Sequence, residues 1–414
     1  MKFAKTAVRA TAILFAVISF ALFLTLYVMK KDVATSYKVN PGESFSLDSK
    51  LPVTAVYKGA KFRQVSASSV GEKYNIDLKL FGFIPFSSTN VEVVDPSYVT
   101  VLGNPFGMKL YTNGVLVIET SSVNTSNGSV DPAKEAGLKV GDYIETIDGI
   151  SVNCNEDVSE IVSGSNGKEL ALKINRKKNS VDLKINPVKD KSDGVYRIGV
   201  WVRDSSAGIG TLTFYSPSDN VICGLGHGIC DEDTGSLLDP SSGEMVGAEI
   251  ISVNKASNGN PGELKGKFTF SSLADIAANK SDGVYGFLKG ELNFGNLTKV
   301  ANKQEVTDGE AQILCTVSGE QPKLYSCNIK KRNLTYLSKT QNLLVTVTDP
   351  DLLDKAGGIV QGMSGSPIIQ NGKLVGAVTH VLVDDPKTGY GIFAENMLKE
   401  AKVAADAKKL KNAS

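Results

Sequence analysis

The feature that most constrains this chain is an uncharged apolar run near its start, Thr11–Met29. As a helix that rises about 1.5 Å per residue, the run would span roughly 28 Å. That length is close to the thickness of the hydrocarbon core of a bilayer. Basic residues flank the run on both sides, so the charge bias that orients such a helix is weak. We expect residues 1–31 to contain a transmembrane anchor and the rest of the chain to lie across the membrane.

A cleaved signal peptide is the alternative interpretation of this run. The run is long for the apolar part of a signal peptide, and no Ala-x-Ala-like cleavage site follows it. These two observations favour an uncleaved anchor.

The composition of the chain predicts a turn-rich, mainly β protein. Its 414 residues suffice for two or three domains, and its 40 glycines accompany many Val, Ile and Thr residues. The 45 basic and 44 acidic residues nearly cancel, which gives no reason to expect a nucleic acid partner. Five cysteines are too few for a disulfide scaffold, although Cys223 and Cys230 could form a disulfide.

Changes in composition divide the chain after the anchor. Residues 32–96 predict a small β region or linker with short strands. Residues 97–188 and 195–398 predict two larger domains, joined by a charged linker that contains glycine. Residues 399–414 form a tail rich in Lys and Ala, which we expect to be helical and solvated.

The segment 97–188 resembles a PDZ domain. Within it, Asp131–Leu138 predicts a short helix, with Pro in the first turn and Gly near the end. Val140–Gly149 predicts a strand and a turn, and a helix around Glu156–Ser163 and a closing strand Glu169–Ile174 follow. The resemblance implies a groove that accepts an extended peptide as an added strand.

The same resemblance implies where such a peptide ends. A glycine-containing loop is expected to bind the peptide carboxylate through its backbone amides. This loop consists of Phe106, Gly107, Met108, Lys109 and Leu110. A PDZ fold used only as a rigid spacer or a regulatory lid is the alternative.

The segment Gly358–Ile369 has the pattern that a serine nucleophile requires. Such a serine needs an exposed Oγ on a tight turn, with two backbone amides directed at the developing oxyanion. Gly362 and Gly365 flank Ser364 and let the chain fold closely around it. The amides of Gly362 and Ser364 are therefore the expected oxyanion donors. The pattern resembles the Gly-x-Ser-Gly-x-Pro turn of chymotrypsin-like peptidases; Ser366 as nucleophile and a plain surface turn are the alternatives.

Either of two histidines could supply the general base. His227 follows an apolar strand and lies between two glycines, which is the place expected for the base. His380 ends the strand after the serine hairpin, and a structural role is the preferred interpretation for it. Cys223, His227 and Cys230 could instead bind zinc, although their spacing fits no common zinc site. We expect His227 to be the base, with no metal and no other cofactor.

The third predicted member of the site is a carboxylate that accepts a hydrogen bond from His227. Asp349 stands at the end of an apolar strand and is the preferred candidate. Asp231, Asp233 and Asp239 follow His227 closely, but such local acidic turns are more often solvated caps.

Together these segments resemble the stage IV sporulation protein B (SpoIVB) serine peptidases of endospore-forming bacteria. The resemblance covers residues 10–395, and the family's His, Asp and Ser fall on His227, Asp349 and Ser364. It implies a membrane anchor, a PDZ domain and then a trypsin/chymotrypsin-like β-barrel peptidase domain. Three segments carry it: Gly224–Ile229, Gly358–Pro367 and Gly376–Val381.

The resemblance also implies a cellular role. Members of the family are single-pass proteins of the forespore that face the space between the forespore and mother-cell membranes, and self-cleavage can release them. They cleave themselves and a membrane-bound regulator of the intramembrane protease that activates sigma-K. The implied partners are therefore the chain itself, that regulator, the membrane, and peptide C-termini in the PDZ groove. A catalytically silent, membrane-tethered PDZ binding module is the alternative function.

Overall fold

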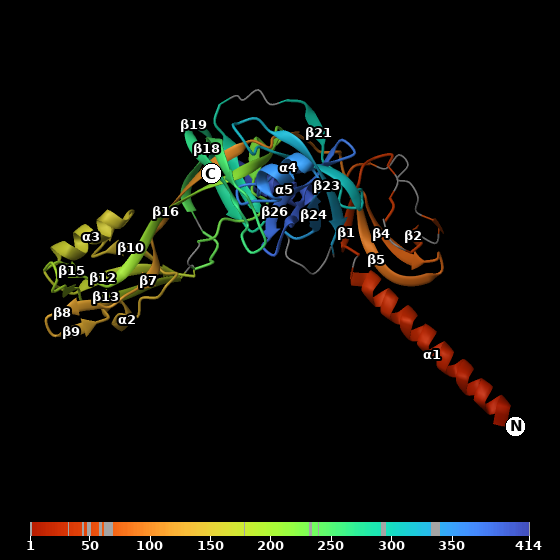
Figure 1. The fold of residues 1–414 in the computed structure, drawn as a ribbon, viewed down its shortest axis with the longest axis horizontal. Coiled ribbons are helices and arrows are strands. Elements are labelled where there is room, and N and C mark those ends of the chain that lie inside the picture. The colour runs from red at the N-terminus through yellow and green to blue at the C-terminus, as the bar shows by residue number, and fades with distance from the viewer. Residues whose placement is uncertain are drawn as a thin grey trace.

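The computed structural model describes the whole chain except residues 1, 32, 44, 48–50, 58–59, 62–68, 178, 232–233, 239, 291–294, 333–339 and 414. It is mainly β, with an apolar N-terminal helix, a PDZ domain and a peptidase region built from barrels. This confirms the predicted fold class. In Figure 1 the barrels lie at the centre, the PDZ domain at one end, and a small β unit with the first helix at the other end.

The first element is the helix α1 (Lys2–Lys31), which projects away from the rest of the molecule (Figure 1). Its segment Arg9–Lys30 is long and apolar enough to cross a membrane, and none of that span is buried in the structure. An exposed apolar helix of this length needs lipid around it or removal as a signal sequence.

A small five-stranded sheet follows α1. Its strand order is β1-β5-β4-β2-β3, and β1 pairs with β5 in parallel. Alternating side chains such as Ile76, Leu78 and Val91 are fully buried and form its own apolar core. Its strands are β1 (Ser36–Val39), β2 (Val53–Tyr57), β3 (Ala60–Lys61), β4 (Lys73–Leu80) and β5 (Ile84–Val93).

The PDZ domain has a separate core, in which Val115, Ile144 and Leu172 are among the buried residues. Its sheet has the order β13-β12-β10-β7, and β8 pairs with β9 in a separate hairpin. Its elements are β8 (Val123–Thr125), β9 (Gly128–Val130), α2 (Pro132–Glu135), β10 (Tyr143–Ile147), β11 (Ile150–Ser151), α3 (Asn155–Gly164), β12 (Leu170–Arg176), β13 (Asn179–Ile185), β14 (Val188–Lys189) and β15 (Tyr196–Arg197).

The first barrel is a ring of strands that closes because β16 pairs with both β17 and β7. Around the ring the order is β7-β18-β19-β20-β17-β16, and β6 and β21 extend the sheet from β16. The strands are β6 (Tyr98–Val101), β7 (Pro105–Thr120), β16 (Val200–Ser216), β17 (Val221–Gly224), β18 (Pro240–Asn254), β19 (Glu263–Lys280), β20 (Gly283–Leu288) and β21 (Leu297–Lys299).

The second barrel is closed in the order β22-β23-β24-β27-β26-β25. The helix α4 (Pro350–Ala356) connects β24 to the segment that precedes β25. The strands are β22 (Gly309–Cys315), β23 (Lys323–Lys331), β24 (Leu343–Val347), β25 (Pro367–Gln370), β26 (Lys373–Leu382) and β27 (Asp385–Phe393). The junction of two such barrels can hold a catalytic site, because each barrel can supply a different catalytic group.

Two long strands join the PDZ domain to the first barrel. The early part of β7 pairs with β18 in the barrel, and its later part, from Val115, pairs with β10 in the PDZ sheet. The strand β16 follows β7 throughout: Val200 pairs with Thr120 at the PDZ end, and Thr211 pairs with Pro105 at the barrel end. The two units therefore share β-structure and are not separated by a flexible linker at this point.

The prediction that Phe106–Leu110 forms a peptide-binding loop is wrong. These residues lie in the middle of β7, paired with β16 on one edge and with β18 on the other. Phe106 and Leu110 are buried in the barrel interior. A strand with both edges paired has no free backbone groups for an added peptide strand. Phe106–Leu110 therefore cannot form the predicted carboxylate-binding loop.

The C-terminal tail is helical, as predicted, but it is not solvated throughout. The helix α5 (Ala394–Ala413) begins directly after β27. Ala401 and Ala405 on one face are buried against an apolar cluster that includes Phe214 and Tyr285 of the first barrel. The small alanine side chains let the helix approach the barrel closely, so half of the tail belongs to the folded body.

Candidate active site

The turn that carries Ser364 lies between α4 and β25, where two glycines adopt backbone angles that other residues avoid. Gly362 has φ +93° and Gly365 has φ +94°, values in the left-handed region that favours glycine. Met363 is fully buried and Ser364 is half-buried. The Ser366 hydroxyl is buried and donates to the carbonyl oxygen of Met363 at 2.6 Å. The turn thus presents Ser364 outward and directs Ser366 inward.

Strand β16 of the first barrel holds the carbonyl oxygens of this turn. Thr211 donates from its amide to the Ser364 carbonyl oxygen at 2.9 Å and from its hydroxyl to the Gly362 carbonyl oxygen at 2.9 Å. Thr213 donates from its hydroxyl to the Gly365 carbonyl oxygen at 2.8 Å. These three hydrogen bonds fix the peptide groups that follow Gly362, Ser364 and Gly365.

The amides of the turn divide into two groups. Those of Met363, Gly365 and Ser366 donate to carbonyl oxygens at 3.1, 2.7 and 3.0 Å. In the described part of the chain, no group accepts a hydrogen bond from the amide of Gly362 or of Ser364. A pair of unused amides beside a serine hydroxyl is the arrangement that an oxyanion hole requires. The predicted donors are therefore available for that role.

His227 lies just beyond β17, after a turn in which Leu225 and Gly226 both have positive φ. Its Nδ1 lies 2.8 Å from the carbonyl oxygen of Gly228. A carbonyl oxygen can only accept, so this contact places a proton on Nδ1 and leaves Nε2 of the neutral ring as an acceptor. Desolvation lowers the pKa of His227 below its ordinary value of 6.5, and the contact with Gly228 offsets part of that effect. The ring is therefore suited to act as a base near neutral pH.

The strand β26 brings Ser364 and His227 into one neighbourhood. The Ser364 hydroxyl donates to the Thr379 carbonyl oxygen at 2.6 Å. The next residue, His380, lies against His227, with ring centroids 4.6 Å apart and planes tilted by 33°. Partial burial and the nearby His227 lower the pKa of His380 to about 4. His380, to which the sequence assigned a structural role, therefore lies at the candidate site.

Asp349 is not placed to orient His227. One carboxylate oxygen accepts from the amides of Asp351 and Leu352 at 3.0 and 3.2 Å, and the other accepts from the Ser326 amide at 3.1 Å. Asp349 is thus the N-cap of α4, followed by Pro350 in the first turn. The Nδ1 atom of His227, which a triad carboxylate would bind, contacts the Gly228 carbonyl oxygen instead. The predicted role of Asp349 is not supported by this geometry.

Asp231 does not fill this position either. Asp231 is buried and forms an ion pair with Arg203 of β16 at 2.5 Å. Hydrogen bonds from Thr234 and this ion pair outweigh desolvation and lower the pKa of Asp231. Asp233 and Asp239 lie outside the described residues.

The placement of the two cysteines argues against the alternative of a zinc site. Cys223 is fully buried in a core cluster and Cys230 is exposed, and both are free thiols. Desolvation raises the pKa of the Cys223 thiol well above its ordinary value, which opposes the thiolate that zinc binds. Among the described residues, no group of three His, Cys, Asp or Glu side chains is arranged to hold a metal ion.

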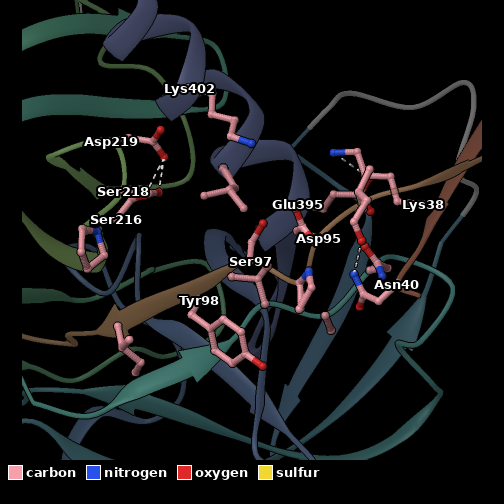
Figure 2. A pocket seen from close by; sticks show the side chains of 18 of the residues that line it. Lys38, Asn40, Asp95, Ser97, Tyr98, Ser216, Ser218, Asp219, Glu395 and Lys402 are labelled. Atoms are coloured by element: carbon pink, nitrogen blue, oxygen red, sulfur yellow. Dashed lines mark hydrogen bonds and ion pairs between the residues drawn. The ribbon is translucent and has the colours of Figure 1, made fainter. Parts of the chain in front are cut away.

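A separate pocket of about 600 Å³ lies where the small N-terminal sheet meets the first barrel and α5. Figure 2 shows Lys38 and Asn40 on one side of it, Ser218 and Asp219 on the other, and Lys402 of α5 above. None of the predicted catalytic residues lines this pocket. It is therefore a second hollow and not the candidate active site.

The close packing at Gly365 gives a first testable prediction. A Cβ at this position would lie 2.0 Å from the Thr211 carbonyl oxygen and 2.4 Å from the Leu225 amide nitrogen. We expect Gly365→Ala to lower the free energy of unfolding by about 3 kcal/mol or more, from backbone strain and overpacking together. The control is Gly372→Ala, with φ +72° and open space around the added methyl group, which should cost about 1 kcal/mol. Equal losses in denaturant unfolding would show that the turn is loosely packed.

Comparisons with known proteins match two segments of the chain. Residues 194–398 match the family described as SpoIVB peptidase S55, and residues 130–176 match a PDZ domain. These matches and the barrels show a β-barrel peptidase region joined to a PDZ domain. The chain belongs to the SpoIVB peptidase S55 family.

A further similarity is local. The protein LL2128 of Lactococcus lactis subsp. lactis (strain IL1403), whose name describes it as a zinc metalloprotease, is 47% identical over 70 residues. That segment is 17% of this chain and 16% of LL2128. The chain therefore matches about a sixth of the length of that relative.

Proposed function

We propose that this chain is a membrane-anchored serine endopeptidase, with Ser364 as nucleophile and His227 as general base. The observation that carries the proposal is the pair of unused amides at Gly362 and Ser364, on a turn next to a neutral, oriented histidine.

The reaction follows from these positions. Ser364 Oγ forms a bond to the carbonyl carbon of the substrate, and its proton passes to Nε2 of His227. The negative charge that develops on the substrate oxygen is stabilised by the amides of Gly362 and Ser364. His227 then gives its proton to the departing amine, and water, activated by the same nitrogen, hydrolyses the acyl-enzyme.

Two features of the site distinguish it from a Ser-His-Asp triad. The Gly228 carbonyl oxygen fixes the tautomer of His227, which is the task that a carboxylate has in that triad. The Ser364 hydroxyl donates to Thr379 in this structure, so it must rotate toward His227 before attack. That contact is also the observation that favours the alternative function, a catalytically silent PDZ binding module.

The lowered pKa of His227 predicts the pH dependence of the reaction. His227 acts as a base only when neutral, and its pKa lies below the ordinary value of 6.5. We expect kcat/KM to fall at acid pH with a midpoint below pH 6.5. Because kcat/KM reports the free enzyme, its pH profile on a short peptide substrate tests this directly. An acid limb with its midpoint above pH 6.5 would contradict the assignment.

The cellular role is proposed from the family. We infer a single-pass protein of the forespore, with its domains in the space between the forespore and mother-cell membranes. It cleaves itself and a membrane-bound regulator in the sporulation signalling pathway that leads to sigma-K activation. The apolar helix α1 and the family match support this proposal.

Self-cleavage gives the test of the proposed function. Full-length wild type and Ser364→Ala are expressed in parallel and compared by N-terminal sequencing and intact mass. We expect the wild type to be cut between residues 32 and 95 and the variant to keep its anchor. Equal trimming of both would assign the cut to another protease, and an untrimmed wild type would favour the silent binding module.

A further inference from the structure

A short hairpin of the small N-terminal sheet exposes aromatic side chains. It joins β4 to β5, and its tip is the apolar run Leu80–Phe86. Phe83 is 71% exposed and Phe81 is 51% exposed. The sequence has no charged residue between Lys79 and Glu92. The tip therefore presents an aromatic surface within a stretch of chain that carries no charge.

The neighbouring strand β2 extends this uncharged surface. It begins at Val53, which pairs with Leu80 at the base of the tip. The segment Leu51–Tyr57, which contains β2, has no charged residue either. The Phe81 amide donates to the Pro52 carbonyl oxygen at 2.9 Å, so the tip is bonded to the chain that leads into β2. The exposed aromatic groups thus belong to a hydrogen-bonded edge of the sheet.

The turn at the tip holds Phe81 in a conformation that bulky residues avoid. The Phe83 amide donates to the Leu80 carbonyl oxygen at 3.2 Å. The two residues between them, Phe81 and Gly82, have φ +52° and +83°. A hairpin turn with positive φ at both central positions favours Asn, Asp or Gly there. An exposed phenylalanine at such a position is strained, which suggests that its side chain has a function outside the fold.

The tip lies on the side of the sheet from which α1 enters. β1 runs parallel to β5, with Ser36 opposite Asn90. Just before β1, the Ala34 carbonyl oxygen accepts from the Thr89 hydroxyl at 2.8 Å. The chain thus meets β5 near Thr89 and continues in the direction away from Ile84 and the tip. The helix α1 contacts β5, and Figure 1 shows β5 beside the end of the helix.

The reach of the hairpin fits a contact with the membrane that α1 would cross. Phe83 comes six residues before Thr89, and a strand rises about 3.3 Å per residue, so the tip can extend up to about 20 Å from that point. The apolar span of α1 ends at Lys30, close to the same point. Val33 and Phe86 pack against one core cluster, which joins the end of the helix to the hairpin.

We propose that the hairpin between β4 and β5 inserts into the lipid bilayer beside α1 and forms a second membrane contact of this chain. The proposal rests on the membrane anchor of the proposed function and does not depend on peptidase activity. Phe81 and Phe83 lie at the boundary between headgroups and acyl chains, a depth that suits exposed aromatic side chains. Lys79, at the start of the uncharged run, extends its ammonium group to the lipid phosphates.

A second contact restricts how the body of the protein moves above the membrane. A single helix lets the rest of the chain rotate about the helix axis, whereas a hairpin held in the same bilayer stops that rotation. The small sheet is also joined to the barrels. Lys299 of β21 pairs with Glu43 at 2.6 Å, and Lys38 of β1 pairs with Glu395 of α5 at 3.7 Å. The helix and the hairpin together therefore set the direction in which the candidate active site faces.

The test is quenching of tryptophan emission by brominated lipid, measured on the full-length chain in phosphatidylcholine vesicles. The background carries Ser364→Ala, which prevents the proposed self-cleavage, and Trp201→Phe, which removes the single natural tryptophan. Phe83→Trp places a reporter at the tip of the hairpin. Val70→Trp is the matched control, because Val70 is 51% exposed at the opposite end of the same sheet. Phe20→Trp reports whether α1 itself lies in lipid. Each variant is compared in vesicles with and without bromine on the upper acyl carbons.

We expect bromine to reduce the emission of Phe83→Trp at least about twofold, because interfacial side chains lie about 5 to 10 Å into the boundary of headgroups and acyl chains. Phe20→Trp should be quenched as well, and Val70→Trp should keep its emission. If Phe20→Trp is quenched and Phe83→Trp is not, the proposal is overturned, and a protein becomes the better partner for the hairpin. Equal quenching of Val70→Trp and Phe83→Trp would also overturn it. If none of the three is quenched, the membrane anchor of the proposed function is refuted together with the hairpin contact.

Discussion

Replacing Ser364 by alanine is expected to reduce peptidase activity by about 10⁴- to 10⁶-fold, the loss typical of a removed serine nucleophile. The Ser364 hydroxyl is the group that faces outward from the turn, between the unused amides and the β26 strand. The methyl group of alanine fits the same space, so the fold should be unchanged. The measurement is kcat/KM on a quenched fluorescent peptide, with thermal unfolding of both proteins as a check.

Ser366→Ala is the control for this prediction. Ser366 is buried, and its hydroxyl donates to the Met363 carbonyl oxygen at 2.6 Å. Its loss removes one buried hydrogen bond, which costs about 1 kcal/mol of stability. We expect activity within about tenfold of the wild type, because a stability loss of this size leaves most of the chain folded. An inactive Ser366→Ala beside an active Ser364→Ala would reverse the assignment of the nucleophile.

The second large effect is expected at His227, and it contrasts with a small effect at Asp349. His227→Ala should reduce kcat/KM by about 10⁴- to 10⁶-fold, because the proton of Ser364 then has no acceptor. Asp349→Asn should keep kcat/KM within about tenfold of the wild-type value, because asparagine caps a helix as well as aspartate does. In a Ser-His-Asp triad the same change costs about 10⁴-fold. The comparison separates a helix cap from a catalytic carboxylate.

A third variant completes this comparison. Asp349→Ala removes the acceptor for three amides at the start of α4. It should lower the free energy of unfolding by about 1 to 2 kcal/mol, the usual cost of losing an N-cap. Asp349→Ala should retain peptidase activity when the activity is measured at a temperature where the variant is folded. A loss of activity in Asp349→Asn equal to that of His227→Ala would show that Asp349 is the carboxylate of a catalytic triad.

Local patterns in the sequence predicted the elements that depend on neighbours in the chain. The glycines around Ser364 indicated a turn with free amides, because positive φ and close packing leave few other residues possible there. The apolar run at the start indicated α1, because the length and composition of the run are enough to predict such a helix. In both cases the physical cause lies within about twenty residues of sequence.

The predictions that the structure does not support, and the placements that the sequence could not anticipate, concern residues whose role depends on distant partners. The segment Phe106–Leu110 has a glycine and apolar neighbours, as a binding loop would, but β16 and β18 pair with both of its edges. Asp349 precedes a proline, which is a signal for a helix start as much as for a catalytic carboxylate. His380 was assigned a structural role because no local feature shows that β26 places it against His227. Sheet pairing over a hundred residues or more cannot be derived from local periodicity.

The most direct test of the central claim is covalent labelling of the purified full-length chain by a peptidyl phosphonate. Such a reagent reacts with a serine only when a base activates the hydroxyl and an oxyanion hole stabilises the adduct. We expect one adduct, located on Ser364 by mass spectrometry of the proteolytic fragments, and none in His227→Ala. Labelling of another serine, or no labelling of a folded wild-type chain under any condition that permits self-cleavage, would contradict a serine peptidase built on Ser364.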